Sequence, residues 1–389
     1  MNMPPPSRGK IIVFGILFWY PLAGVTFQFL HYLLGLRRLG YDVYYVEDSG
    51  RWVYDPRLND MTGDATPNID AIAPVLEAHG FGGRWAFRGN YPGGRCYGMT
   101  EAELMQLYRD ADAFLNVTAA QELRDEHLSI PRRIYVESDP FPAQVKAAQG
   151  DAGTTAMLAA HDTHFTFGES VGSADCSLPD VGIRWLPTRQ PVVLDLWPEQ
   201  LPGTSYRTIT TWHNKSKELT WQGETYHWTK DREFRRLIDL PTRCAEPFAL
   251  AVDVDDDTRC ELRRHGWSIR SSTQLSADVA SYQSFIASSR GEFTVARDQY
   301  VRPRTGWFSD RSACYLAAGR PVVTQDTGFG LHLPTGKGLF AFTALDDVIA
   351  AITDIESDYN AHSRAAREIA AEYFAAETVL GSLMDRAGL

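Results

Sequence analysis

Short apolar strands alternate with helices along the first half of the chain, and the alternation starts again after a stretch rich in proline and glycine. Lys10–Phe18 is predicted as a buried strand, Gly24–Leu39 as a helix and Tyr41–Glu47 as the next strand. A strand, a helix and a strand in this order open a doubly wound sheet. The sequence therefore predicts an α/β protein with two Rossmann-like domains that face each other across a cleft.

The other predicted elements support this division of the chain. Ser49–Pro67 is expected to be a long surface loop, and Ala361–Ala387 a single long helix. Further strands are predicted at Ala113–Val117, Arg133–Val136, His164–Phe167, Tyr206–Thr211, Phe248–Val252, Trp267–Arg270, Glu292–Val295, Pro321–Thr324 and Gly338–Phe342. A chain of 389 residues suits two domains of ~150–200 residues. The expected divisions are a loose tail at 1–9, an N-terminal domain at 10–196, a linker at 197–205, a C-terminal domain at 206–360 and a final helix at 361–389.

One charge-free run could be mistaken for a membrane segment. Ile11–Leu36 holds no Asp, Glu, Lys or Arg and is long enough to span a bilayer. A turn at Tyr20–Gly24 divides the run, and Gln28 and His31 lie in its second part. We therefore predict a strand, a turn and a helix, with a cleaved signal peptide or a membrane anchor as the alternatives.

The net charge indicates which partners the protein binds, and the cysteine content indicates the cellular compartment in which it works. The chain has 49 acidic and 38 basic residues, a net charge of −11, whereas proteins that bind duplex nucleic acid usually carry a basic excess. Its five cysteines are scattered and form no CxxC pair. We expect no duplex nucleic-acid partner and no stable membrane insertion, and a reducing, cytoplasmic location.

The segment Arg290–Gly330 is rich in arginine. Its first part contains five arginines and no lysine: Arg290, Arg297, Arg302, Arg304 and Arg311. Arg304–Ser312 is a predicted loop that enters a helix, with Ser309 or Asp310 as the N-cap and Gly306 allowing close backbone approach. Arginine and a helix N-terminus both suit a diphosphate. A solvated arginine-rich face is the alternative.

The helix predicted over Asp310–Ala318 is followed by Gly319, which suits a C′ position. The next strand leads into Gln325–Gly330 at its C-terminal end, which is where ligands bind in open α/β sheets. Gln325 and Asp326 could accept sugar hydroxyls, and Gly328 could offer backbone amides. An ordinary loop is the alternative.

The run WFSDRSACYLAAGRPVVTQDTGFG resembles the donor-nucleotide motif of GT-B glycosyltransferases, closest to bacterial family-1/4-like enzymes, some of them natural-product or heptose transferases. The resemblance implies a GT-B fold, a nucleoside-diphosphate sugar (UDP-, ADP-, GDP- or dTDP-linked) and a final helix that returns to the first domain. Cys314 stands where the family often has an acidic ribose-binding residue; Asp310, one turn earlier, is a substitute. The expected donor-site residues are Lys230, Gly306, Ser309, Asp310, Arg311, Ser312, Gln325, Asp326, Thr327, Gly328 and Phe329.

Carboxylates that follow a strand of the first domain are candidates for the catalytic base. An inverting transferase needs a base for its acceptor hydroxyl. Asp139 is the first candidate and Glu137 the second, and both follow the strand at Arg133–Val136. The alternatives are that Asp139 caps the helix predicted over Pro140–Gln149, or that a retaining mechanism needs no such base. The expected acceptor-binding residues are Tyr20, Gly24, Gln28 and Glu169.

No metal or cofactor is expected. His161 and His164 lack the spacing of a metal motif and are predicted to be surface or interdomain histidines, and Asp253–Asp257 lacks features of a calcium loop. The sequence thus predicts metal-independent transfer of a sugar to a small-molecule acceptor, with a homodimer left open. The rival functions are a sugar-nucleotide 2-epimerase of the same fold and a non-catalytic binding subunit.

Overall fold

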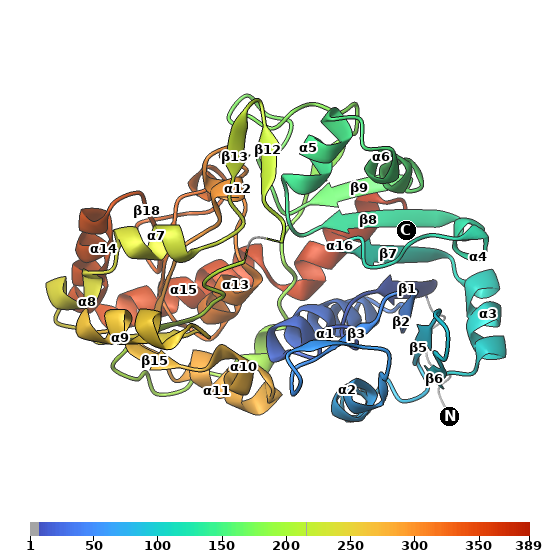
Figure 1. Cartoon of the computed structure of the whole chain (residues 1–389), viewed down its shortest axis with the longest axis horizontal. Helices are drawn as coiled ribbons and strands as arrows, with labels where there is room; N and C mark the ends of the chain where they lie inside the picture. Colours follow the sequence, from blue (N-terminus) through green and yellow to red (C-terminus); the bar gives the residue numbers. More distant parts are fainter. Residues whose placement is uncertain (1–7, 215) are drawn as a thin grey trace.

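The computed structural model describes residues 8–214 and 216–389, so most of the predicted tail at 1–9 lies outside the described residues. Its larger sheet has eight strands in the order β10-β9-β8-β7-β1-β2-β5-β6, all parallel except β6. Figure 1 shows this sheet in one of two lobes. Its strands are β1 (Lys10–Phe14), β2 (Asp42–Ser49), β5 (Trp85–Gly89), β6 (Cys96–Gly98), β7 (Ala113–Val117), β8 (Arg132–Glu137), β9 (Thr163–Thr166) and β10 (Trp185–Pro187).

Helices cover both faces of this sheet. Alternate residues of β1 point to opposite sides, and because both sets are apolar, each face must be buried. Ile11 and Val13 pack toward α1, α2 and α16, whereas Ile12 and Phe14 pack toward α3. With the β3–β4 hairpin these elements form what we call the N-lobe. The other elements of the N-lobe are α1 (Ala23–Arg38), β3 (Val53–Asp55), β4 (Asp60–Thr62), α2 (Thr66–Ala78), α3 (Glu101–Asp110), α4 (Asp125–Leu128), α5 (Pro142–Ala148), α6 (Ala152–Ala159) and α16 (Ala376–Arg386).

The second half of the chain forms the C-lobe around a smaller parallel sheet. Its strands run in the order β15-β14-β11 and β16-β17-β18, and a bridge between Tyr206 and Gly291 joins the two sets. The strands are β11 (Tyr206–Ile209), β14 (Phe248–Ala251), β15 (Ser268–Arg270), β16 (Glu292–Thr294), β17 (Val322–Gln325) and β18 (Leu339–Phe342). The helices are α7 (Asp231–Arg236), α8 (Leu240–Arg243), α9 (Asp256–Arg264), α10 (Ser272–Ser276), α11 (Val279–Ala287), α12 (Asp298–Val301), α13 (Asp310–Ala317), α14 (Leu345–Ser357) and α15 (Tyr359–Tyr373).

The prediction of one long C-terminal helix is wrong. α15 ends at Tyr373, and the chain pairs with Val192 before α16 begins: the Val192 amide donates to Phe374 O (2.7 Å) and the Ala376 amide to Val192 O (2.9 Å). α15 packs in the C-lobe, whereas α16 packs against α1 (Figure 1). The return to the first lobe therefore starts near residue 375, not at 361.

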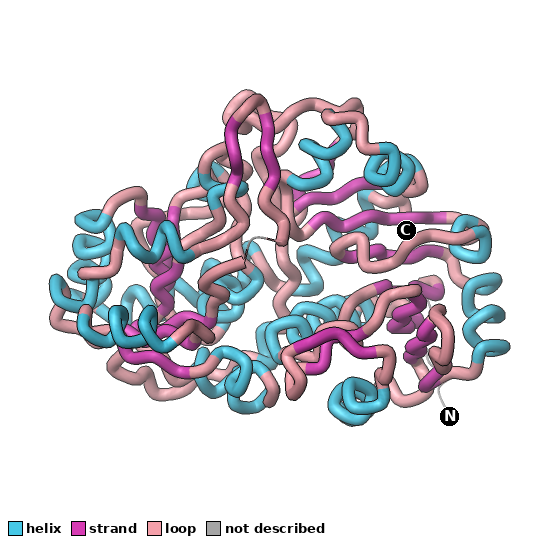
Figure 2. Tube along the Cα trace, viewed as in Figure 1, coloured by secondary structure: helices cyan, strands magenta, loops and turns pink. Residues whose placement is uncertain are grey.

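Two hairpins were missed. β3 and β4 form an antiparallel pair inside the predicted surface loop 49–67, and β12 (Leu219–Trp221) pairs with β13 (Glu224–Tyr226) where only a connection was expected. Figure 2 shows β12–β13 projecting beside the N-lobe. There the Gln149 side chain donates to Thr220 O (2.7 Å), so this hairpin bridges the two lobes.

The charge-free run forms β1 and α1, as predicted. Among the described residues, no helix is long and apolar enough to cross a membrane. The run is instead part of the junction between the lobes: Ala23 and Phe27 of α1 share an apolar cluster with Trp197 and with Tyr282 and Tyr315 of the C-lobe. Trp197, the first residue of the predicted linker, is completely buried.

Candidate active site

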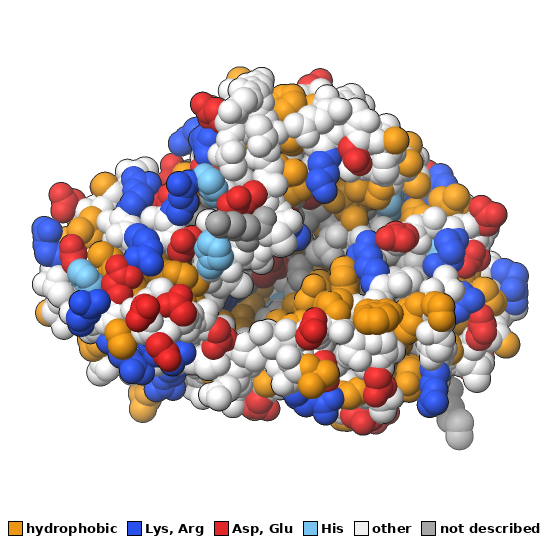
Figure 3. Space-filling model, viewed as in Figure 1, with side chains coloured by type: hydrophobic (Ala, Val, Ile, Leu, Met, Phe, Trp, Pro, Cys, Tyr) orange, Lys and Arg blue, Asp and Glu red, His pale blue; other side chains and the backbone are white. Residues whose placement is uncertain are grey.

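A group of charged residues lies near the carboxyl ends of strands in both sheets. Figure 3 shows a hollow between the two lobes. The N-lobe contributes Asp139, which follows β8. The C-lobe contributes Lys230 before α7, Arg297 after β16, and Asp310 and Arg311 at the start of α13. In open α/β sheets this is the edge that binds ligands. We call these five residues the cleft cluster.

Lys230 differs from the two arginines of the cluster because its side-chain nitrogen has no partner among the described residues. Only 6% of its surface is exposed, and its ammonium group has no hydrogen bond or ion pair among the described residues. Burial, together with the positive charges of Arg311 and Arg297, holds the pKa of Lys230 well below its usual value. The negative charges of Glu292 and Asp139 offset only part of this effect, and neither carboxylate forms an ion pair with the amine. A buried amine without a paired carboxylate is costly, so the site is suited to an anionic ligand.

The two arginines of the cluster differ in their partners. Arg311, predicted to bind phosphate, is held by the fully buried Glu292 (2.5 Å), by Ile209 O (2.7 Å) and by the Thr294 hydroxyl (2.9 Å). Arg297 lies over the Trp228 ring at 3.6 Å and donates to Trp228 O (3.1 Å). Arg311 is therefore built into the C-lobe, and Arg297 lies toward the cleft.

Asp139 contacts the C-lobe. Its Oδ1 accepts a hydrogen bond from the Tyr300 hydroxyl (2.5 Å) and lies 4.0 Å from Arg297, and its Oδ2 lies 3.8 Å from the Lys217 ammonium. The Asp139 side chain remains 35% exposed. The alternative role as a helix cap is wrong, because α5 has Phe141 at its N-cap and Gln144 accepts from the Phe141 amide.

Glu137, the second candidate for the base, is buried beneath Asp139 with 1% of its surface exposed. Its carboxyl group accepts hydrogen bonds from the Gln144 amide (2.9 Å) and the Thr166 hydroxyl (2.6 Å). Burial raises its pKa to about 8. Its location inside the N-lobe, with both oxygens engaged, favours Asp139 as the base.

Asp310 begins α13 and faces Asp139. Burial, and then the negative charge of Asp139, raise the pKa of Asp310 to about 7. Ser309 is the N-cap residue but makes no side-chain capping bond, and the Ser312 hydroxyl is buried without a partner among the described residues. Cys314, at the family's ribose-binding position, is buried with its Sγ 3.7 Å from His31 Nε2.

The other predicted donor residues are largely engaged with one another. Gln325 accepts from the Ala296 amide (3.1 Å) and donates to Glu233 (2.7 Å), and Asp326 pairs with Arg304 (3.3 Å). Thr327 Oγ1 donates to Trp307 O (2.5 Å), Asp326 also accepts from the Gly328 amide (2.8 Å), and Phe329 packs on Phe308. These contacts shape the loop beside the cleft.

Gly306 is needed for contact between the lobes. Its φ is +76°, and a Cβ atom there would lie 2.8 Å from both the amide nitrogen and the Oγ of Ser170 in the N-lobe. The backbone therefore approaches the other lobe, not an open ligand site.

The predicted acceptor residues lie in three places. The Tyr20 ring, in the loop after β1, lies between the rings of Trp19 (5.0 Å) and Tyr54 (5.6 Å), tilted against both. Gly24 and the half-buried Gln28 lie on α1, where a Cβ at Gly24 would lie 3.2 Å from the Tyr282 hydroxyl of the C-lobe. Glu169 pairs with Arg189 (2.8 Å) and is nearly buried. Of these residues, Tyr20 belongs to an aromatic surface.

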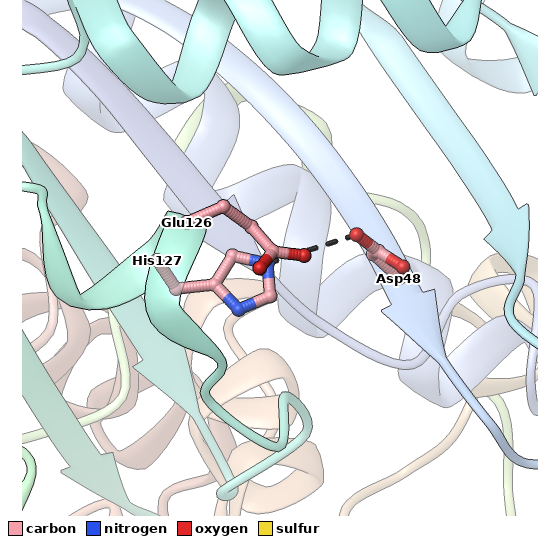
Figure 4. Close-up of side chains that lie close together, drawn as sticks. All are labelled: Asp48, Glu126 and His127. Carbon is pink, nitrogen blue, oxygen red and sulfur yellow. Dashed lines mark ion pairs between the residues drawn. The ribbon is translucent and has the colours of Figure 1, made fainter.

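Asp48, Glu126 and His127 lie close enough together to resemble a metal site (Figure 4). His127 Nδ1 accepts a hydrogen bond from the Arg124 amide (3.0 Å), so the proton of the neutral ring is on Nε2, which faces Asp48 at 3.6 Å. Arg124 also pairs with Asp48 (2.5 Å). A protonated Nε2 and an arginine on the carboxylate make this group an internal ion-pair network.

His161 and His164, predicted to be surface or interdomain residues, are instead buried in the N-lobe. Their rings bond to Met157 O (2.7 Å) and Leu158 O (2.8 Å). The Asp253 carboxylate accepts from Ser272 and Thr273 (both 2.7 Å), which explains this acidic run without an ion.

Sequence reasoning did not assign roles to Lys217, Arg297 and Tyr300. Arg297 was visible only as one of several arginines. The contacts of Lys217 and Tyr300 with Asp139 depend on two segments separated by 78 and 161 residues from it. No periodicity or motif in the sequence marks that approach.

No family model matches the sequence, and no curated protein matches it. Solved structures do resemble it. HepE of Anabaena in complex with UDP superposes with a TM-score of 0.57 at 12% identity, covering 98% of this chain and 100% of that one. An alpha-glucosyltransferase bound to UDP and a 13-mer DNA gives 0.56 at 11% (99% and 100% covered), and AviGT4, a glycosyltransferase of avilamycin A biosynthesis, gives 0.52 at 10% (98% and 97%).

Two of these three structures are named as glycosyltransferases, and all three matches extend over nearly the whole chain. One of them holds DNA, so this architecture by itself does not rule out a nucleic-acid acceptor; the expectation against one rests on the net charge alone. With two Rossmann-like lobes, a cleft between their carboxyl edges and a C-terminal helix that returns to the first lobe, the chain has the GT-B fold.

Proposed function

We propose that the protein transfers a sugar from a nucleoside-diphosphate donor, with UDP as the first nucleotide to test, to the hydroxyl group of a small-molecule acceptor. The observation that carries this proposal is Lys230, a buried amine with no ion pair among the described residues. It lies near Arg297 and Arg311 at the ligand-binding edge of the C-lobe. Similar solved structures of the same fold hold UDP or UDP-glucose.

The cleft cluster contains residues suited to activating the acceptor and residues suited to stabilising the leaving diphosphate. Asp139 would accept the proton of the acceptor hydroxyl while the new bond forms between the acceptor oxygen and the anomeric carbon. The bond from that carbon to the diphosphate breaks, and Lys230 and Arg297 would stabilise the negative charge that the departing diphosphate retains. These cations could serve without a metal ion, so we expect EDTA to leave turnover unchanged.

Lys230→Met tests the donor site. We expect UDP affinity to fall by ~1.5–3 kcal/mol, the range for hydrogen bonds to charged groups. Because the pKa of Lys230 is low in the free protein and an anion favours the charged amine, UDP binding should take up a proton and weaken as the pH rises. Titration calorimetry at several pH values measures both effects.

Lys337→Met is the matched control, because it removes a lysine of the same lobe whose side chain is exposed. Its UDP affinity and pH slope should equal those of the wild type. Equal UDP binding by Lys230→Met and the wild type, with both folded, would remove Lys230 from the donor site and the main support for this function.

Measurements of UDP-sugar turnover distinguish the proposed function from two rival functions. A sugar-nucleotide 2-epimerase would convert its UDP-sugar without any acceptor, and a non-catalytic subunit would bind UDP weakly or not at all. Incubation of the protein with UDP-glucose and UDP-N-acetylglucosamine, followed by product analysis with and without acceptors, distinguishes these cases.

A further inference from the structure

The β3–β4 hairpin exposes an unusual amount of apolar surface. The large hydrophobic side chains that are exposed among the described residues are Trp52, Leu58, Met61, Leu128, Leu201 and Leu331. Three of the six fall within Trp52–Met61, and Trp52 is 55% exposed. Such a concentration marks a binding surface more often than chance scatter does.

A row of neighbouring rings, tilted against one another, leads from this hairpin into the loop after β1. The Arg51 guanidinium lies 4.7 Å from the Trp19 ring, Trp19 lies 5.0 Å from Tyr20, and Tyr20 lies 5.6 Å from Tyr54. The negative charge of Asp253, after β14 of the C-lobe, reinforces the effect of burial in raising the pKa of Tyr54. The Tyr54 end of the row therefore lies on the side of the N-lobe nearest Asp253 of the C-lobe. We call Trp19, Tyr20, Trp52 and Tyr54 the aromatic face.

A buried carboxylate fixes the loop that carries this row. Glu47, at the end of β2, accepts hydrogen bonds from the amides of Phe18 (2.6 Å) and Trp19 (2.9 Å) and from the Tyr45 hydroxyl. The Asn68 side chain donates to Phe18 O (2.6 Å) and Tyr54 O (2.9 Å), tying the loop to the hairpin. The rings thus belong to a surface held in place before any ligand arrives.

A polar cavity of about 450 Å³ lies beyond the β3–β4 hairpin, between the start of α2 and the segment that joins β5 to β6. Its lining includes Gly63, Asp64, Thr66, Tyr91, Arg95 and Tyr97. A Cβ on Gly63 would lie 3.6 Å from the Trp52 indole nitrogen and 3.9 Å from the Tyr91 ring. Tyr91 therefore lines the cavity, and Trp52 lies beside Gly63 at its margin. The structure gives Arg95 no ion-pair partner within residues 8–214 and 216–389, and Asp64 keeps one carboxylate oxygen beyond its bond to the Thr66 amide (3.0 Å).

We propose that the aromatic face and this cavity bind the acceptor, and that the acceptor is a glycoside whose sugar ring packs on Trp52. This inference rests on the proposed function for its reaction, but its binding surface is separate from the donor site. A sugar presents an apolar C–H face to aromatic rings and hydroxyls at its edge, which matches rings beside an arginine, a carboxylate and tyrosine hydroxyls.

The same features disfavour two other ligands. A lipid chain would leave Asp64 and Arg95 desolvated without partners, which is costly. A membrane surface would favour a basic hairpin, whereas Arg57 pairs with Asp55 (2.6 Å), Arg51 pairs with Glu122 (3.1 Å), and the whole chain has a net charge of −11.

Saturation-transfer NMR with maltose, lactose, cellobiose and trehalose, with and without saturating UDP, tests this proposal on the full chain. We expect at least one disaccharide to bind, and Trp52→Ala and Arg95→Met each to weaken it by about tenfold, the effect of one good stacking or charge-assisted contact. Leu331→Ala, at 56% exposure, and Arg263→Met, on exposed α9, are the matched controls and should bind like the wild type.

The readouts separate this inference from the proposed function. UDP affinity should be the same in all four variants, because none lies in the cleft cluster. The proposal of a glycoside site is wrong if no disaccharide binds, or if neither Trp52→Ala nor Arg95→Met changes the affinity for it. Either result would count against the site even where UDP still binds. Cosedimentation with phosphatidylcholine–phosphatidylglycerol vesicles that Trp52→Ala abolishes would also overturn it, in favour of a membrane.

Discussion

Asp139 is the residue on which the chemistry of the cleft depends. Because it does not cap α5, Asp139→Asn should leave the stability of that helix unchanged while removing a base. We expect turnover to fall ~10²–10⁴-fold, the usual contribution of a positioned base. UDP should bind at least as tightly, since one negative charge near Lys230 and Arg297 is lost. Steady-state kinetics and calorimetry measure the two effects.

Asp175→Asn, at an exposed site of the same lobe, is the control and should match the wild type in both measurements. Normal turnover by Asp139→Asn would favour a retaining mechanism, in which the donor phosphate takes the acceptor proton. In that case the contact with Tyr300 would serve only to join the lobes.

Glu47 makes stability depend on pH. Burial raises its pKa from 4.5 to about 8, against hydrogen bonds from Tyr45, Phe18 and Trp19 that favour the charged form. A carboxyl group with a raised pKa binds more protons folded than unfolded, so its contribution is complete below pH 4.5 and is lost as the pH rises through about 8. We expect the free energy of unfolding to decline by a few kcal/mol over that interval.

Urea unfolding of the wild type and Glu47→Gln at a series of pH values checks this expectation. The variant keeps one acceptor oxygen, places an NH2 group where the second oxygen was, and cannot titrate. It should be less stable than the wild type, but its decline with pH should be shallower. Parallel pH profiles for the two proteins would show that Glu47 does not titrate in this range.

At the level of whole elements, the contact of α1 with α16 is very close. A Cβ on Gly35 would lie 2.6 Å from Leu380 Cδ1 and 2.9 Å from Ala376 Cβ. Alanine normally stabilises a helix by ~1 kcal/mol relative to glycine, but overpacking costs ~1–3 kcal/mol. We expect Gly35→Ala to lower the free energy of unfolding measured in urea.

Gly381 provides the reverse case on the facing helix. A Cβ there would meet only Leu39 Cδ2, at 3.9 Å, an ordinary contact. Gly381→Ala should therefore be neutral or stabilising by up to ~1 kcal/mol. A stabilised Gly35→Ala would mean that α16 can move away from α1 without loss.

Elements with strong local signals could be predicted, and those that depend on distant pairing could not. Thr100 caps α3 in a capping box with Glu103, a pattern of neighbouring residues that the sequence itself displays. Ala113–Val117 forms β7 with the predicted bounds. By contrast, residues 361–387 are good helix formers throughout, and only pairing with Val192 divides them. The short strands of both missed hairpins include exposed polar residues, so they lack an apolar signature.

The candidate site follows the same rule. The positions of Asp139 and Lys230 could be proposed because each adjoins a predicted element at the expected edge of a sheet. The engagement of Arg311 with Glu292 could not, since it depends on how β16 and α13 lie together. An arginine in a sequence motif has the same local signal whether it binds a ligand or a buried carboxylate.

On the scale of the whole molecule, the lobes are joined by a shared apolar junction. The Phe27 ring lies 4.7 Å from Trp197 and 5.9 Å from Tyr282. We expect the wild type to unfold in one calorimetric transition, and Phe27→Ala, which should cost ~3–5 kcal/mol, to separate the unfolding of the two lobes.

Phe114→Ala, in the core between the N-lobe sheet and α3, is the matched control. It should lower the N-lobe's stability while leaving the junction intact. Two well-separated transitions in the wild type would show that the junction does not couple the lobes.

The return of α16 to the N-lobe also sets an order of events during synthesis. A ribosome delivers the strands of the N-lobe first, but the helix that covers α1 near Gly35 is made last, after every strand of the C-lobe. The C-lobe can therefore be complete while the N-lobe still exposes the apolar surface of α1 that α16 will bury. A message that ends before codon 375 would leave the first-made lobe permanently unfinished, although its own sheet is fully encoded.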